Sequence, residues 1–335
     1  MTGGRPLLAF LLLAAGAAEA RPPIIDMHIH ARRAAFDGTN APALCAPPTT
    51  MPRWDNSRPI AEGLSPDPPC PALLQPERNA DGVMRGTLAV MARRNVIAMV
   101  SGEPEDVARW RAAAPERVIA GLDLRTRPGG RLPARTPDEL RRLHAAGAFT
   151  ILGEVMAQYE GIAPADSALE PYWALAEERG IPVGIHLGPG TAGTAYAGGP
   201  HYRAAASSAL GMEEVLIRHR RLRVYLMHAG YPLGDDLLAL LYAHPQVYVD
   251  IAAIVATEPR PAFHAYLRRI VEAGFGDRIM FGTDQGIWPG LIEVAIRSIE
   301  EAPFLSAAQK RDIFYNNAAR FLRLTPAEIA RHHAM

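Results

Sequence analysis

The stretch Ile24-Ile25-Asp26-Met27-His28-Ile29-His30 decides the fold. It is a short apolar run that ends in two histidines two positions apart, and side chains two apart on a strand leave from the same face. Histidines on an apolar strand are often ordinary core residues, but burying two imidazoles together is costly unless they share a partner. Neutral imidazole is a good ligand for Zn²⁺. The pair therefore predicts a buried strand whose end faces a metal site.

The same arrangement recurs along the chain. Four further apolar runs end in a carboxylate or an imidazole, at Glu154, His186, His228 and Asp284. A buried carboxylate such as Asp284 is costly unless a cation lies beside it. Five apolar strands that end in metal-ligand chemistry are what a parallel barrel with a metal at its C-terminal mouth requires.

Eight strand-like runs alternate with helix-like stretches. The runs are rich in Val, Ile and Leu, as strands buried on both faces should be, and they cover 24–30, 96–101, 118–124, 149–155, 181–187, 223–229, 247–252 and 279–284. Between them, a period of 3.6 residues predicts helices at 82–94, 104–114, 137–146, 169–179, 209–220, 234–243, 261–274 and 290–300. We therefore expect an α/β fold, one (β/α)₈ TIM barrel over residues 21–335, with a last helix at 306–323 and a short tail at 325–335.

The N-terminus predicts export. Arg5 precedes an apolar run from Leu7 to Ala18, which ends in the small-residue pattern Ala18-Glu19-Ala20. This pattern is typical of a signal peptide over residues 1–20, and the apolar run is shorter than the roughly 20 residues that span a bilayer. We expect a periplasmic or secreted protein with no stable membrane insertion after cleavage. A buried N-terminal helix is the alternative.

One connection is far longer than the others. Residues 31–80 follow the first strand, are rich in Pro, Asn, Asp and Ser, and show no sustained period. Loops of this length are usually functional or disordered, so this insertion is either a lid over the barrel mouth or a disordered surface segment. It contains both cysteines, Cys45 and Cys70. An oxidising compartment favours their pairing, worth about 3 kcal/mol for such a loop, and metal ligation is the alternative.

The composition excludes several classes of partner. The 335 residues carry no formal net charge, with 49% hydrophobic and 21% charged residues, as in an ordinary soluble globule. The chain has no excess of basic residues, which argues against nucleic acid or an anionic membrane as a partner. The only lysine is Lys310, near the C-terminus, which argues against Schiff-base chemistry on the barrel. A small-molecule substrate is expected, and a homo-oligomer is possible.

These motifs together resemble the amidohydrolase superfamily, in the branch that includes aminocarboxymuconate-semialdehyde decarboxylase. The resemblance covers nearly all of residues 21–335 except the insertion. It implies a barrel that holds one or two divalent metals, most simply Zn, with His228 as a further ligand or a catalytic acid or base. The ligands that it implies are His28, His30, His186 and Asp284. The matching segments are Ile25-Asp26-Met27-His28-Ile29-His30, Gly184-Ile185-His186-Leu187, Met227-His228-Ala229-Gly230, Phe281-Gly282-Thr283-Asp284 and Asn317-Ala318-Ala319-Arg320.

Glu154 bears on whether there is one metal or two. Superfamily members with two metals often bridge them with a carboxylated Lys or a Glu on the fourth strand, and Lys310 lies outside the barrel order. Glu154 stands where a bridging carboxylate would be. The alternative is that Glu154 orients a ligand histidine without touching the metal.

The preferred hypothesis is hydrolysis of an amide, ester or lactone by a metal-activated water, with Asp284 as general base and His228 stabilising charge. The nearest alternative is a non-oxidative decarboxylase with the same ligands, whose anionic substrate would want an arginine. A second alternative is a non-catalytic, exported barrel that binds a metal or ligand. Candidate substrate contacts, each following a strand, are Tyr159, His201, Tyr202 and Trp288, and the candidate arginines are Arg32, Arg33, Arg125 and Arg127.

Overall fold

The computed structural model describes residues 21–31, 43–65, 70, 72–127, 130, 133–188 and 190–335. The predicted signal peptide, residues 1–20, lies outside the described residues, as do Arg32 and Arg33. Within the described ranges, no helix has both the length and the apolar character needed to cross a membrane.

The predicted (β/α)₈ barrel is confirmed. In the described part of the chain, eight parallel strands follow one another in chain order: β1 (Ile24–His30), β6 (Val96–Ser101), β7 (Val118–Leu124), β8 (Ile151–Val155), β9 (Val183–His186), β10 (Val224–Met227), β11 (Tyr248–Asp250) and β12 (Ile279–Met280). The last strand meets the first through backbone hydrogen bonds from Met27 N to Phe281 O and from Asp284 N to His28 O, at 2.9 and 2.8 Å. The sheet is thereby closed on itself.

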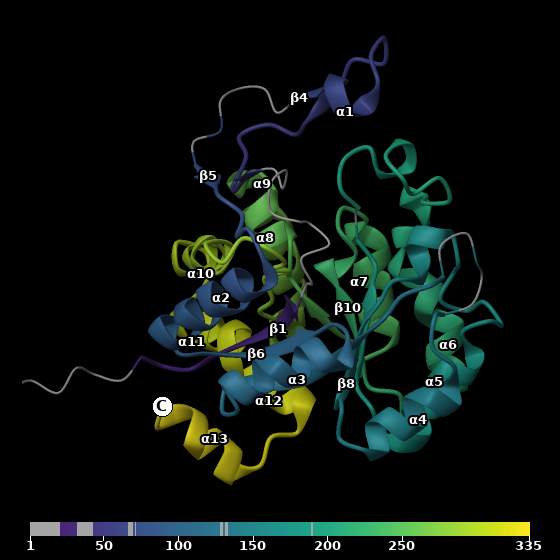
Figure 1. Cartoon of the computed structure of the whole chain (residues 1–335), viewed down its shortest axis with the longest axis vertical. Helices are drawn as coiled ribbons and strands as arrows, with labels where there is room; N and C mark the ends of the chain where they lie inside the picture. Colours follow the sequence, from purple (N-terminus) through teal and green to yellow (C-terminus); the bar gives the residue numbers. More distant parts are fainter. Residues whose placement is uncertain are drawn as a thin grey trace, which may run out of the picture.

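Helices surround the strands (Figure 1). The starts of these helices follow from local chemistry. The Asn79 side chain caps α2 (Ala80–Arg94), and Thr136 followed by Pro137 begins α4 (Pro137–Ala145). Gly180 ends another in the left-handed conformation that glycine adopts freely. The helices are α2 (Ala80–Arg94), α3 (Pro104–Ala113), α4 (Pro137–Ala145), α5 (Glu170–Arg179), α6 (Glu213–Arg218), α7 (Gly234–Ala243), α9 (Arg260–Ile270) and α10 (Leu291–Glu300), with the short α8 (Ile254–Thr257) before α9.

The barrel interior is packed below the mouth. Tyr225 is fully buried there, and its hydroxyl donates to Met27 O at 3.1 Å. Glycine makes room for its ring, because a Cβ at Gly184 would lie 2.5 Å from Tyr225 Cζ. The interior is therefore a core and not a pore, which leaves the C-terminal ends of the strands as the place for chemistry.

A bulge in the first strand sets the direction of its histidines. Ile25 and Met27 belong to the interior cluster, whereas Ile29 packs in the outer cluster between strands and helices. The pairing of β1 with β6 shifts between Asp26 and Ile29. Such a shift turns side chains without ending the strand, so the two histidines after Met27 also face the interior.

The insertion is an arm with a stapled base. Its base is a short antiparallel pair, β2 (Leu44–Cys45) with β5 (Leu73–Leu74), and beyond it β3 (Arg53–Trp54) pairs with β4 (Leu64–Ser65) beside α1 (Ile60–Gly63). The predicted disulfide joins Cys45 and Cys70, whose Cα atoms lie 5.6 Å apart. Figure 1 places α1 and β4 at the top of the view, above the barrel.

Two predicted helices are divided in the structure. The helix expected at 209–220 is divided between a 3₁₀ segment, Ala209–Met212, and α6. That expected at 306–323 is interrupted by a π-helical turn between α11 (Ala307–Arg311) and α12 (Asn317–Leu322).

The prediction of a short tail at 325–335 was wrong, because residues 326–333 form helix α13 (Pro326–His333). A capping box between Thr325 and Glu328, with Pro326 at the first helical position, starts this helix.

Candidate metal centre

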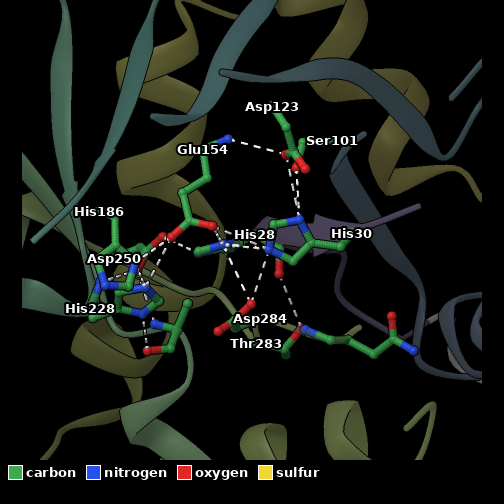
Figure 2. A network of polar contacts seen from close by, with 12 residues as sticks. His28, His30, Ser101, Asp123, Glu154, His186, His228, Asp250, Thr283 and Asp284 are labelled. Carbon is green, nitrogen blue, oxygen red and sulfur yellow. Dashed lines mark hydrogen bonds and ion pairs between the residues drawn. The ribbon is translucent and has the colours of Figure 1, made fainter. Parts of the chain in front are cut away.

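The two histidines of β1 meet at the mouth of the barrel (Figure 2). Both are at most 1% exposed, and their Nε2 atoms lie 3.2 Å apart. Asp284 Oδ1 lies 3.1 Å from His30 Nε2 and 3.6 Å from His28 Nε2. The first and last strands thus bring these three donors to one point.

Glu154 lies between this group and a second pair of imidazoles. Its Oε2 atom is 3.8 Å from His28 Nε2 and 3.5 Å from His30 Nε2. Its Oε1 atom contacts His186 Nδ1 and lies 3.4 Å from His228 Nε2. The two carboxylate oxygens therefore face one histidine pair each, as Figure 2 also shows.

The second pair comes from the next two strands. His186 ends β9, His228 directly follows β10, and His186 Nδ1 lies 3.0 Å from His228 Nε2. His228 Nδ1 lies 3.0 Å from the carbonyl oxygen of Ala252. Because a carbonyl only accepts, Nδ1 must carry a proton, which leaves Nε2, on the side of Glu154 and His186, as the nitrogen available to a cation.

Two of these residues have an unusual backbone. His228 and Asp284 take φ values of 61° and 58°, in the left-handed region that residues other than glycine seldom occupy. Such conformations persist where the surroundings enforce them, and they gather at functional sites. The hydrogen bond from Asp284 N to His28 O is one such constraint.

The donors fit a divalent cation. Two sets of three potential ligand atoms lie within 4.8 Å of one another: His28 with Glu154 and His228, and His28 with His30 and Asp284. His186 Nε2 is buried and has no hydrogen-bond partner. Nitrogen and carboxylate oxygen are the ligands of catalytic zinc sites, although the same donors suit other transition metals. All six residues predicted as ligands are brought together here, and their individual roles stay predictions.

The charges around the cluster keep its carboxylates ionised. Burial opposes ionisation of Glu154, but His186, His228 and His28 outweigh it and hold the pKa of that carboxyl well below its usual range. Burial likewise opposes ionisation of Asp284, yet His28 and His30 lower its pKa. Both side chains are therefore ionised and can act as ligands of a cation.

Sequence reasoning missed three residues that hold the histidines from behind. Asp250 Oδ2 lies 3.2 Å from His28 Nδ1, and both Ser101 and Asp123 face His30 Nδ1, at 3.2 and 3.5 Å. The signal was available, because these three also stand at or beside the ends of predicted strands. Carboxylates in this position fix the tautomer of a ligand histidine and direct its other nitrogen to the metal.

The predicted substrate contacts are placed unequally. The Tyr159 ring packs against His186, with centroids 4.7 Å apart, and Tyr202 lies 5.8 Å beyond it. His201 is exposed, and Trp288 is half-buried against the hydrophobic core. The structure thus brings Tyr159 and Tyr202 to the wall of the site, and all four contacts stay predictions.

One candidate arginine lies near the cluster. Arg125 is half exposed, and its Nη2 lies 3.1 Å from Asp123 Oδ2. Since Asp123 faces His30, Arg125 is placed at the rim of the site. Arg127 is exposed on the same loop.

Solved structures share this fold at low sequence identity. A 5-carboxyvanillate decarboxylase from Sphingomonas paucimobilis is 18% identical, with 71% of this chain and 82% of that chain covered and a TM-score of 0.51. A probable 2-pyrone-4,6-dicarboxylic acid hydrolase from Acinetobacter baumannii is 13% identical over 90% and 99%, with a TM-score of 0.56. A 4-oxalomesaconate hydratase from Rhodopseudomonas palustris is 17% identical over 90% and 95%, also with a TM-score of 0.56.

The family is decided by sequence. No curated protein matches the chain, but residues 25–324 match the amidohydrolase family, and this range includes every predicted ligand. The chain therefore belongs to the amidohydrolase family of metal-dependent (β/α)₈-barrel enzymes.

Proposed function

We propose that this protein is a metal-dependent hydrolase that acts on a small-molecule amide, ester or lactone. The observation that carries the proposal is the position of Glu154, whose two oxygens each face a different histidine pair. A carboxylate in this position can be shared by two neighbouring cations, one at His28 and His30 and one at His186 and His228. Two-cation sites of this kind are typical of hydrolytic enzymes.

The chain's own residues divide the work. A divalent cation bound here would polarise the substrate carbonyl and lower the pKa of water. The Asp284 side chain is 28% exposed, against at most 5% for His28, His30, Glu154, His186 and His228. The most accessible carboxylate of the cluster is therefore the one placed to take a proton from water and return it to the leaving group.

His228 has a supporting role in this proposal. Its Nδ1–H donates to Ala252 O, so its Nε2 faces Glu154 and His186. The Tyr159 ring beside His186 would then form the wall against which the substrate lies.

Metal content and two variants test the proposal. Purified wild type should hold about two equivalents of metal, and Glu154→Gln about one, because the shared carboxylate is lost. Asp284→Asn should lower kcat on the best substrate of an ester, amide and lactone panel by at least about 100-fold. Asp235→Asn, which changes an exposed carboxylate on α7, is the matched control and should leave kcat unchanged.

Normal turnover by Asp284→Asn would show that Asp284 is not the proton acceptor. Absence of metal from the wild-type protein, together with no turnover of any ester, amide or lactone in the panel, would favour the non-catalytic binding barrel.

A decarboxylase is the second candidate. The set of His28, His30 and Asp284 can hold a single cation without Glu154, and Arg125 is available at the rim for an anionic substrate. Several solved structures with this fold are named as decarboxylases. One equivalent of metal, with carbon dioxide released from unsaturated or aromatic carboxylic acids, would replace the hydrolase proposal with this one.

We also propose that the mature protein is exported. The pattern of residues 1–20 and the Cys45–Cys70 disulfide support this, because disulfides persist in oxidising compartments. Cell fractionation that found the full-length chain in the cytoplasm would contradict it.

A further inference from the structure

The inference starts from the positions of two strands in the barrel. The eight strands follow chain order, so β1, the first, and β9, the fifth, lie on opposite sides of the mouth. The arm, described over residues 43–65, 70 and 72–74, follows β1, and the segment 187–208 follows β9. A contact between these two segments must therefore cross the mouth.

The base of the arm rests on the side of the first and last strands. Glu77 N, just after the arm, donates to Ile287 O at 2.9 Å. A Cβ at Gly290 would lie 3.1 Å from Leu74 Cδ2, so Leu74 packs directly on the segment after β12. The disulfide of Cys45 with Cys70 holds the two sides of the base together.

The tip of the arm is held by its own hydrogen bonds. Arg58 N donates to Asp55 O at 3.1 Å, and Ser57 N donates to the Asp55 carboxylate at 3.0 Å. Trp54 Nε1 donates to Arg58 O at 3.1 Å. The turn therefore presents the indole as a fixed surface.

The tip contacts the segment from the opposite strand. The rings of Trp54 and Tyr196 have centroids 5.1 Å apart, a distance at which aromatic pairs attract. Ile60 lies against Gly193, where an added Cβ would be only 2.3 Å from Ile60 Cδ1. Gly193 has φ of 79°, so glycine suits both the turn and the close approach.

We infer that the arm is a crossbar over the mouth, which slows the passage of molecules between the solvent and the site beneath it. The inference deepens the proposed function and rests on it for the identity of the site beneath. The contacts of Trp54 with Tyr196 and of Ile60 with Gly193 are the far end of the crossbar, and the disulfide is the near end.

The rate at which a chelator removes bound metal tests the inference. Zinc-loaded full-length protein is mixed with excess EDTA, and metal loss is followed with time. Trp54→Ala should lose metal about threefold to tenfold faster than wild type, as expected for loss of one aromatic pair. Cys45→Ser with Cys70→Ser should also lose metal faster. The equilibrium affinity for zinc should stay unchanged in both variants, because the metal centre contains no arm residue.

The matched control is Tyr242→Ala, because Tyr242 is also an exposed tyrosine, 85% accessible on α7, but lies outside the arm and the segment after β9. Tyr196→Ala should behave like Trp54→Ala, and Tyr242→Ala like wild type. Equal rates in wild type, Trp54→Ala and Tyr196→Ala would overturn the crossbar.

A second measurement does not depend on the metal. Hydrogen exchange of the backbone amides of residues 193–197 should be faster in Trp54→Ala than in wild type. If the wild type bound no zinc, the proposed function would fail, and exchange would still decide whether the arm holds this segment. Unchanged exchange in the variant would reject the contact itself.

Discussion

Asp250 illustrates how much of the site depends on residues behind the predicted ligands. One carboxylate oxygen lies 3.2 Å from His28 Nδ1, and the other accepts from His228 N and Ala252 N at 2.9 and 3.0 Å. Asp250 thus orients one histidine by its ring and another by its backbone. With Nδ1–H donated to Asp250, the Nε2 side of the His28 ring faces Glu154 and Asp284 and is the side available to a cation.

Asp250→Asn should weaken zinc affinity about tenfold to 100-fold, as other losses of such partners do. The amide cannot accept at both positions, so the His28 ring loses its fixed tautomer. Competition with a chromophoric chelator measures the affinity. Asp106→Asn, which changes a buried aspartate on α3, is the control, and an equal loss in both variants would contradict the specific role of Asp250.

Glu258 provides a prediction on pH at the same scale. Burial raises the pKa of this carboxyl although Tyr231 acts in the opposite direction. The folded state therefore holds the proton more tightly than the unfolded chain, and stability falls as the pH rises from the unfolded pKa through the folded one.

Glu258→Gln should remove this dependence. The variant should be more stable than wild type at pH 8, and the difference should shrink toward pH 4, where the wild-type carboxyl is protonated. Urea unfolding at both pH values measures it. If the variant is less stable than wild type by the same amount at pH 8 and at pH 4, ionisation of Glu258 does not lower the free energy of unfolding.

At the scale of elements, the positions of the strands could be predicted from the sequence, but the irregularities in their pairing could not. The apolar runs located all eight strands and the six residues of the metal centre. Period alone could not reveal the bulge in β1 or the shift in pairing of β8 with β9 between Leu152 and Val155, around Glu154. Both register shifts depend on how the neighbouring strand pairs, which the apolar pattern of one strand does not contain. Helix α13 was different, because its Thr325-Pro326-Ala327-Glu328 start is a local signal that the sequence carries.

The segment after β9 gives a prediction for an element. A Cβ at Gly188 would lie 2.4 Å from His228 Cβ, so Gly188→Ala should displace His228. We expect kcat/KM to fall at least about tenfold, since small misplacements at an active site have large effects, and stability to fall by about 1–3 kcal/mol.

The control for this substitution is Gly276→Ala, where the nearest atom to an added Cβ is 3.6 Å away. Steady-state kinetics and urea unfolding of both variants test the prediction. Full activity in Gly188→Ala would mean that His228 tolerates displacement and is not held by this contact.

At the scale of the molecule, cation binding and folding are coupled. The ligands come from five strands, so the unfolded chain offers no comparable site. A metal at 100 times its Kd should therefore add about 2.7 kcal/mol to the free energy of unfolding. The gain should decrease as the pH falls, because protons compete for the imidazoles, and the carboxylates beside His28 raise its pKa well above the usual range despite burial.

Melting temperatures with and without zinc, from pH 8 to pH 5, measure this coupling. The double variant His28→Ala with His30→Ala is the control and should show no shift with zinc. A zinc-induced shift of the same size in that variant would place the bound metal elsewhere in the molecule.

The closure between the first and last strands determines when the centre can assemble. His28 is synthesised long before Asp284, and Asp284 N is fixed to His28 O only after β1 has met the segment that follows β12. A partly synthesised chain that lacks Asp284 therefore has no complete metal centre to fill. Because these donors suit several transition metals, the ions available where the chain completes its fold would influence which metal it takes up.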